Sequence, residues 1–236
     1  MKLPVLLIAL LACCQIHAQQ LGGWLTTSFN INFKNKKLNG FFEAQLRANN
    51  VANNIFYNEV KGGINYKAFS NAQFLLGTGN YRTYQPQGNL KGPILVNEIR
   101  LWQQAVLTDY LSRLKIEHRF RVEQRFFKNA DYRNRFRYRV NFLYPLNKKK
   151  FEKGTVYLNA HDEIFLNNKA PHFERNRLFF GTGYYLNKTL TLQAGGMNQY
   201  NYTVNNTSNQ KWFAQLSLLF NINILDDREH LPTVID

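Results

Sequence analysis

Hydrophobic and polar residues alternate one by one along most of the chain, which is the period of a β-strand and not of an α-helix. The stretch 113–126 shows this best, because charged residues occupy all of its odd positions and apolar residues most of its even positions. The stretch 132–144 repeats the pattern with arginine at 133, 135, 137 and 139. Since a strand directs alternate side chains to opposite faces, each stretch predicts a strand with one charged and one apolar face.

The same alternation predicts eleven strands in all. Their expected ranges are 23–33, 38–48, 55–66, 72–82, 94–107, 113–126, 132–144, 155–166, 174–185, 189–200 and 211–224. Strands of soluble proteins average about 5–6 residues, whereas a tilted membrane-spanning strand needs about 9–11. The length of these strands therefore favours a membrane barrel.

The connections between the strands alternate in size. Short ones are expected near 35–37, 68–70, 109–110, 147–153 and 187–188, and longer ones at 49–54, 83–93, 127–131, 167–173 and 201–210. Outer-membrane barrels have short periplasmic turns and longer external loops. The pattern therefore predicts an all-β fold, a single antiparallel transmembrane β-barrel of about 10–12 strands.

Two questions about this barrel stay open at the level of sequence. Eleven is an odd number, whereas bacterial single-chain barrels have an even number of strands. The count stays open between eleven, ten if 23–33 is a partial strand, and twelve if one strand has been missed. A soluble, lipocalin-like barrel with its apolar face inward is the alternative. Aromatic residues near strand ends favour the membrane, as in an aromatic girdle: Phe126, Phe127, Tyr132, Phe142, Tyr144, Tyr184, Tyr185, Tyr200 and Tyr202.

Residues 1–18 have the pattern of a signal peptide, with Lys2 before an apolar stretch that is too short to span a bilayer. Cleavage after Ala18 leaves a barrel over 19–225 and a polar tail over 226–236. Cys13 and Cys14 lie inside the leader, so the mature chain has no cysteine; lipidation at Cys13 is the alternative. The expected location is the outer membrane of a Gram-negative cell.

The chain carries 30 Lys and Arg against 15 Asp and Glu, a net charge of +15. Such a charge is typical of nucleic-acid-binding proteins, but here the arginines alternate with apolar residues and are interleaved with Glu, so no nucleic-acid partner is expected. In the barrel this charged face lines the lumen. The lumen-lining residues of the central strands are Glu98, Arg100, Glu117, Arg119, Arg121, Glu123, Arg125, Arg133, Arg135, Arg137, Arg139, Glu163 and Arg177.

Two interpretations of this lumen remain. Arg and Glu on neighbouring strands can pair and fill the interior, which gives a closed structural or binding barrel. Alternatively, the excess of positive charge makes a narrow, porin-like passive pore that favours anions. The expected partners are outer-membrane lipids and small anionic solutes; the oligomeric state is not predicted.

Little in the sequence indicates an enzyme. Four histidines follow the leader, namely His118, His161, His172 and His230, and no motif places a serine beside any of them. His161 and Glu163 share the luminal face, which keeps an outer-leaflet lipid-modifying enzyme as an alternative. A loop-mediated partner in an envelope complex is another. No metal-binding or cofactor-binding motif occurs.

Several motifs resemble an uncharacterised family of exported β-barrels, domain of unknown function 2490. They are the stretch from Glu98 to Gln104, the stretch from Glu117 to Phe126, Arg135-Phe136-Arg137-Tyr138-Arg139, Tyr144-Pro145-Leu146, Glu163-Ile164-Phe165, Asn176-Arg177-Leu178 with Gly181 and Gly183, and Trp24. The resemblance covers nearly the whole mature chain. It implies an outer-membrane location and supplies no catalytic residue.

Overall fold

The computed structural model describes residues 21–33, 37–86, 89–203 and 207–224, and these residues form eleven strands and no helix. The expected signal peptide and C-terminal tail lie outside the described residues. The strands are β1 (Gly22–Phe33), β2 (Leu38–Ala48), β3 (Ile55–Lys67), β4 (Ala72–Tyr84), β5 (Ile94–Leu111), β6 (Leu114–Phe127), β7 (Arg133–Pro145), β8 (Val156–Asn167), β9 (Phe173–Tyr185), β10 (Leu190–Tyr202) and β11 (Ser208–Ile224). In this part of the chain no helix is long and apolar enough to cross a membrane.

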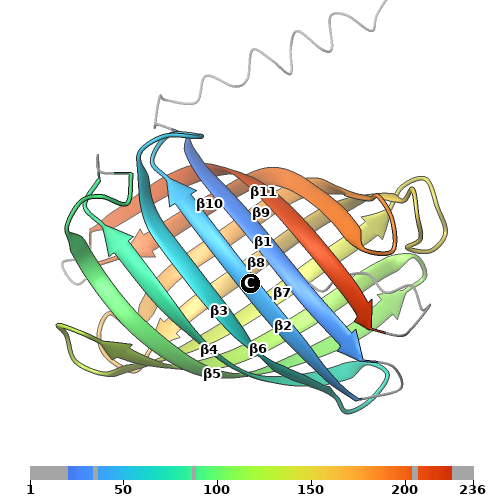
Figure 1. The fold of residues 1–236 in the computed structure, drawn as a ribbon, viewed down its shortest axis with the longest axis horizontal. Coiled ribbons are helices and arrows are strands. Elements are labelled where there is room, and N and C mark those ends of the chain that lie inside the picture. Colours follow the sequence, from blue (N-terminus) through green and yellow to red (C-terminus); the bar gives the residue numbers. More distant parts are fainter. Residues whose placement is uncertain (1–20, 34–36, 87–88, 204–206, 225–236) are drawn as a thin grey trace, which may run out of the picture.

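The strands close into a barrel in chain order, each paired with its sequence neighbours, and β1 pairs with β11. Figure 1 shows β1 and β11 side by side with their arrowheads at the same end. This seam is parallel and runs from Gly22 opposite Phe213 to Phe33 opposite Ile224, whereas every other pair is antiparallel. The predicted barrel is confirmed, and its strands, counted over the described residues, number eleven, as the alternation predicts, and not the ten or twelve of an even-numbered barrel. The parallel seam is what allows an odd number to close.

Because the number of strands is odd, β1 starts at one end of the barrel and β11 finishes at the other. The end where β1 starts, here called the loop rim, carries the connections 49–54, 85–93, 128–132, 168–172 and 203–207. The opposite end, here called the turn rim, carries 34–37, 68–71, 112–113, 146–155 and 186–189. The predicted alternation of short and longer connections therefore has one exception, because 146–155 on the turn rim is long.

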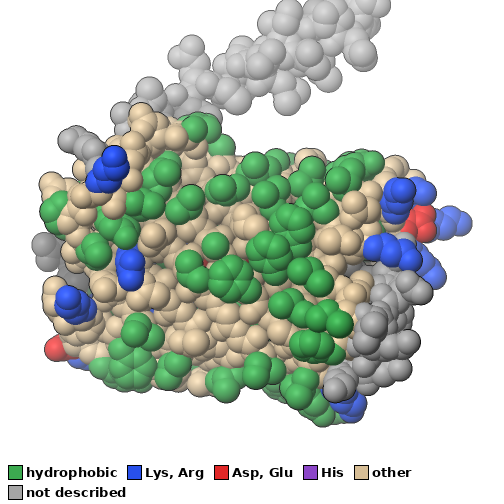
Figure 2. All heavy atoms as spheres, viewed as in Figure 1, with side chains coloured by type: hydrophobic (Ala, Val, Ile, Leu, Met, Phe, Trp, Pro, Cys, Tyr) green, Lys and Arg blue, Asp and Glu red, His purple; other side chains and the backbone are tan. Residues whose placement is uncertain are grey.

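The outer wall of the barrel is apolar. Figure 2 shows hydrophobic side chains spread over the wall, with charged side chains gathered toward the two ends. Exposed apolar residues at mid-height come from strands all around the barrel and include Phe42, Val60, Leu76, Leu101, Phe120, Phe136, Leu178, Phe180 and Leu216. Soluble monomers rarely expose apolar residues on every side in this way, because their apolar patches are few and small.

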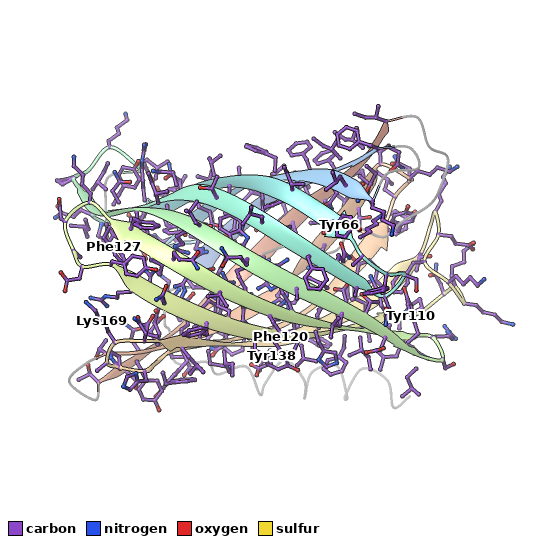
Figure 3. The ribbon with its side chains drawn as sticks, turned by 90° about the horizontal axis from the view of Figure 1, so that it is seen from below. Tyr66, Tyr110, Phe120, Phe127, Tyr138 and Lys169 are labelled. Carbon is purple, nitrogen blue, oxygen red and sulfur yellow. The ribbon has the colours of Figure 1, made fainter. Side chains whose placement is uncertain are left out.

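Aromatic side chains lie on the outer wall at both ends. Tyr66 and Tyr110 lie toward the turn rim in Figure 3, and Phe120 and Tyr138 lie midway. Of the nine aromatics expected in a girdle, six are exposed, Tyr200 is partly buried, and Tyr185 and Phe127 are on the inner side. Tyr185 is 1% exposed and faces the interior, and Phe127 lines a pocket in the loop rim. Tyr185 and Phe127 occupy inward-facing positions in the alternation of their strands. The girdle was predicted only from nearness to a strand end, which does not distinguish inward from outward side chains.

Several polar residues on the outer wall pair across neighbouring strands. His118 Nδ1 lies 2.8 Å from the Tyr138 hydroxyl, and Asn176 donates to Asp162 at 2.7 Å. Gln103 and Gln124 form a similar pair. Each pair satisfies hydrogen-bonding groups that an apolar surrounding cannot.

Candidate functional site

Glu123 is the centre of the largest group of charged side chains inside the barrel, and it is completely buried. Arg135 Nη2 donates to its Oε2 at 2.5 Å, and Arg137 Nη1 donates to its Oε1 at 2.7 Å. Arg121 Nη1 and Arg100 Nη1 lie 3.5 Å and 3.8 Å from the same carboxylate. The register of β6 and β7 sets Glu123 opposite Arg135, so the ladder itself brings these charges together. One carboxylate therefore serves four guanidinium groups.

Glu163 on β8 is the second carboxylate of this group. Arg119 Nη2 donates to its Oε1 at 2.6 Å and Arg137 Nε at 2.8 Å. Arg137 thus bridges Glu123 and Glu163, which is possible because its planar guanidinium offers donors in several directions. Arg139 is also buried and lies opposite Glu163 in the register of β7 and β8. Strands β6, β7 and β8 are joined by these side chains as well as by their backbones.

Further ion pairs, centred on Glu98 and Glu174, lie nearer the loop rim than those of Glu123 and Glu163. Arg125 donates to both oxygens of Glu98, at 2.8 Å and 3.1 Å, and Arg100 pairs with the same Glu98. Glu174 on β9 accepts from Arg125 Nη1 at 3.1 Å and from Arg135 Nη1 at 2.9 Å. These ion pairs close the interior just below the mouth.

Glu174 was not among the lumen-lining residues expected from the sequence, because alternation along β9 assigns it to the outer face. The pairing of β8 with β9 shifts between Phe165 opposite Arg175 and Leu166 opposite Phe173, so Glu174 is an extra residue in a β-bulge. Bulges redirect side chains in this way. The sequence signal was the pair Glu174-Arg175, two charged neighbours within an alternating strand.

A separate group of charges lies on β2 and β3. Lys61 Nζ is 2.7 Å from Glu43 and 2.9 Å from Glu59, and all three side chains are buried. Arg47 Nη2 lies 3.4 Å from Glu59, and its guanidinium stacks over the Trp24 ring at 3.6 Å. The four charged residues belong to the luminal face that the alternation predicts, although the family motifs include only Trp24 of this group.

Three of the expected lumen residues have other surroundings. Glu117 pairs with Lys115 at 2.7 Å near the turn rim. Arg177 is buried and stacks over Phe165, and its Nε donates to Gln199 at 3.0 Å. Arg133 is half-buried at the mouth of the barrel, where it is described below with the pocket.

Buried cations outnumber buried carboxylates among the described residues. The carboxylates are Glu43, Glu59, Glu98, Glu117, Glu123 and Glu163. The cations are Arg47, Lys61, Arg100, Lys115, Arg119, Arg121, Arg125, Arg135, Arg137, Arg139 and Arg177. Arginine tolerates this imbalance better than lysine, because it also stacks on aromatic rings and donates to neutral oxygens.

Aromatic rings fill the interior where the charges do not. Trp102 is completely buried and lies against Gly77 on the neighbouring strand, where a methyl group would come within 2.5 Å of its Cε2 atom. Tyr157 lies over Gly183 in the same manner and donates to Gln193 at 3.2 Å. Each glycine leaves a notch in the wall that the ring of the next strand occupies.

The interior is consequently closed at mid-height. Every strand contributes an inward side chain that is buried from water at this level: Ser28, Glu43, Lys61, Tyr81, Trp102, Arg121, Arg137, Glu163, Phe179, Gln193 and Gln215. A water-filled passage would expose some of them. Ion pairs and aromatic rings together form a plug built from the wall itself.

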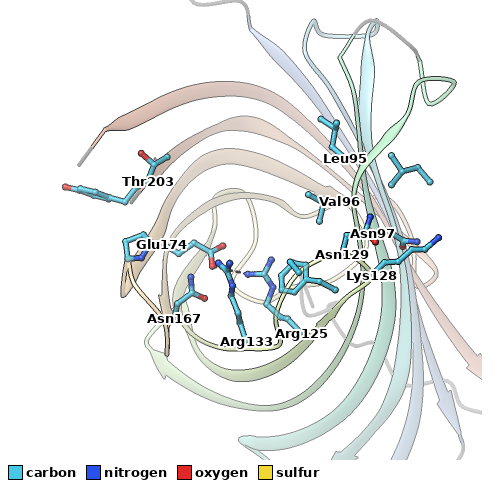
Figure 4. A pocket seen from close by; sticks show the side chains of 15 residues that line it. Leu95, Val96, Asn97, Arg125, Lys128, Asn129, Arg133, Asn167, Glu174 and Thr203 are labelled. Carbon is cyan, nitrogen blue, oxygen red and sulfur yellow. Dashed lines mark hydrogen bonds and ion pairs between the residues drawn. The ribbon is translucent and has the colours of Figure 1, made fainter. Parts of the chain in front are cut away.

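Above the plug, the loop rim holds a pocket of about 530 Å³ (Figure 4). One wall is apolar and comes from Ile94, Leu95 and Val96 at the start of β5. Most of the other lining residues are polar or charged, with Arg125, Lys128, Arg133, Asn167 and Glu174 among them, whereas Phe127, Pro171 and Tyr202 add apolar surface. Pockets of this size accept small organic molecules.

The three described histidines lie in different surroundings, and His118 pairs with Tyr138 on the outer wall. His161 is buried and stacks on Phe179 at 5.0 Å, and it lies opposite Asn141 in the β7–β8 register. His172 lies next to the Asn167 carbonyl oxygen in a loop, and His230 is outside the described residues. No cluster of three or more His, Cys, Asp or Glu side chains suited to a metal occurs in the ranges described.

Comparison with known proteins gives one match. Residues 21–210 match the family described as Protein of unknown function (DUF2490). The chain belongs to this family. The match spans strands β1 to β10 and the first three residues of β11. No curated protein and no solved structure matches the chain.

Proposed function

We propose that this DUF2490 protein is an outer-membrane β-barrel of a Gram-negative cell, with a closed lumen and a binding surface at the loop rim. The observation that carries the proposal is the inversion of its two faces, with apolar side chains outward and buried ion pairs inward. A soluble barrel of this size needs the opposite arrangement. A charged residue facing the lipid at mid-height costs about 2–4 kcal/mol, which fits the scarcity of charges there.

Orientation follows from the rims. We place the loop rim outside the cell and the turn rim in the periplasm, because external loops of such barrels are longer than their turns. The proposal includes no catalytic role; His161 is buried, stacks on Phe179 and lies opposite Asn141. If the protein were a lipid-modifying enzyme, His161→Ala would abolish hydrolysis or acyl transfer on phospholipid or lipopolysaccharide.

Single-cysteine variants test the location and the orientation. Lys169 and Lys149 are exposed lysines on the loop rim and the turn rim, so the two substitutions by cysteine are matched. A membrane-impermeant maleimide applied to intact cells is expected to label Lys169→Cys. It is expected to label Lys149→Cys only after permeabilisation. The unsubstituted protein, which loses Cys13 and Cys14 with its leader, is the control for background labelling.

Each other outcome of the labelling has a definite meaning. Labelling of Lys149→Cys alone would invert the orientation. If neither variant is labelled in intact cells while both are labelled in lysates, the protein does not reach the cell surface and the outer-membrane proposal fails.

Planar-bilayer recording tests the closed lumen. Because buried side chains from every strand occupy the lumen at mid-height, the inserted wild-type barrel is expected to give no steady conductance. Folding is checked on the same sample by the change in gel mobility on boiling. A steady conductance that prefers anions would overturn the closed lumen and favour the pore, which the excess of buried positive charge would then explain.

A further inference from the structure

We propose that the pocket in the loop rim binds an organic anion that carries an apolar body, and that Arg133 holds its anionic group. The inference deepens the proposed function, because it names the class of molecule that the binding surface takes. It rests on three features of the pocket. Arg133 has no carboxylate partner among the described residues, an apolar wall lies nearby, and the carboxylates at the floor of the pocket are already paired with other arginines.

Arg133 differs from the arginines around it. Its side chain makes no ion pair and no hydrogen bond with any described residue, and its buried Nε has no acceptor. Its one side-chain contact of note is with the Phe127 ring, 5.8 Å from the guanidinium carbon. Arg133 also lies directly opposite Arg125 in the β6–β7 register. Like charges placed in this way repel unless a counter-charge lies between or beside them.

Arg125 already has its counter-charges. It binds Glu98 through two nitrogens and Glu174 through the third. Glu174 is held from the other side by Arg135. The carboxylates near the floor are therefore engaged, and the charge of Arg133 is left for a molecule that enters the pocket.

The apolar wall opposite these charges favours a ligand that also has an apolar part. Leu95 is 58% exposed, and Ile94 and Val96 are exposed beside it, all three lining the pocket. Tyr202 and Pro171 extend the apolar surface on the far side. A small inorganic anion would leave this surface in contact with water, whereas an apolar body would cover it. The geometry therefore favours a carboxylate or phosphate attached to a ring or a short chain.

Such chemistry has two natural sources at a cell surface, a free organic acid and the acidic head of a lipid. Both present an anion next to an apolar body. The probe for the shared chemistry is 1-naphthoate, titrated calorimetrically into the purified full-length barrel in phosphatidylcholine nanodiscs. Its neutral isostere 1-naphthamide reports the contribution of charge.

Wild-type protein is expected to bind 1-naphthoate saturably at one site. Because a hydrogen bond to a charged group contributes about 1.5–3 kcal/mol, Arg133→Gln is expected to weaken binding about tenfold or more. Lys149→Gln removes the same charge from the opposite rim and is expected to change nothing. 1-Naphthamide is expected to bind about as weakly to the wild type as 1-naphthoate binds to Arg133→Gln.

Leu95→Ser tests the apolar wall and is expected to weaken 1-naphthoate binding without affecting inorganic phosphate. Equal affinity for inorganic phosphate and 1-naphthoate would overturn the role of the wall. Displacement of 1-naphthoate when phosphatidate is added to the nanodiscs supports the proposal with a lipid source; retention supports it with a free acid.

Absence of 1-naphthoate binding by folded protein, or equal binding by Arg133→Gln, overturns the site. Neither result bears on the membrane location, which the labelling of intact cells tests separately.

Discussion

Glu123→Gln is expected to lower the free energy of unfolding of the barrel by about 3–5 kcal/mol, the cost typical of breaking a buried ion pair from one side. The substitution keeps the shape of the side chain and removes its charge. Arg135 and Arg137 then lose the carboxylate that accepts their shortest hydrogen bonds, and Arg121 and Arg100 lose their nearby counter-charge. The midpoint of urea unfolding in lipid vesicles, compared with wild type, measures the effect.

The matched control is Glu152→Gln. Glu152 pairs with Lys148 at 3.0 Å on the turn rim, where both side chains are largely exposed. Exposed pairs contribute little, so this variant is expected to stay within about 0.5 kcal/mol of wild type. A Glu123→Gln barrel as stable as the Glu152→Gln barrel would mean that water solvates the interior arginines. That outcome would also contradict the closed lumen.

Alternation was sufficient to predict the strands, because a single rule governs every residue of a barrel strand. The eleven expected ranges agree with β1 to β11 to within a few residues, and β2 (Leu38–Ala48) agrees at both ends. The charges of β6 and β7 could be assigned to one face for the same reason. No tertiary information is needed when neighbouring side chains must point to opposite sides.

The seam between β1 and β11 could not be predicted in this way. Parity along a strand does not say whether its partner runs parallel or antiparallel, and the pairing joins residues about 190 positions apart, as in Asn30 opposite Asn221. The expectation of an even number of strands came from other barrels and did not hold here. The inward position of Glu174 was not predicted for a related reason, because a bulge in β9 interrupts the alternation of inward and outward side chains.

The sequence also could not predict which large side chain packs against each glycine. Gly77 within a strand indicates close packing against a large neighbour, but the neighbour, Trp102, is set by the register of β4 with β5. The same holds for Arg133. Its place in the charged face follows from alternation, whereas its lack of a carboxylate partner depends on which residues the register and the bulge bring near it.

Gly77→Ala is expected to destabilise the barrel strongly, and removal of the Trp102 ring is expected to reverse the effect. A methyl group at Gly77 would lie within 2.5 Å of Cε2 and 2.9 Å of Nε1 of that ring, which is completely buried. Overpacking of this kind costs about 1–3 kcal/mol or more. Trp102→Ala alone leaves a cavity and costs about 3–5 kcal/mol. In the Trp102→Ala background, Gly77→Ala is expected to be neutral or slightly stabilising, because the methyl group then has space.

A double-mutant cycle on urea midpoints measures this coupling, which is expected to be about 1–3 kcal/mol. Gly183→Ala is the control, because the nearest atoms that a methyl group would meet there all belong to the Tyr157 side chain on β8 and none to Trp102. Its cost is expected to be the same with and without Trp102. Additive effects of Gly77→Ala and Trp102→Ala would show that the ring does not occupy the notch. The aromatic half of the plug would then be absent, and the lumen would have to be closed by its ion pairs alone.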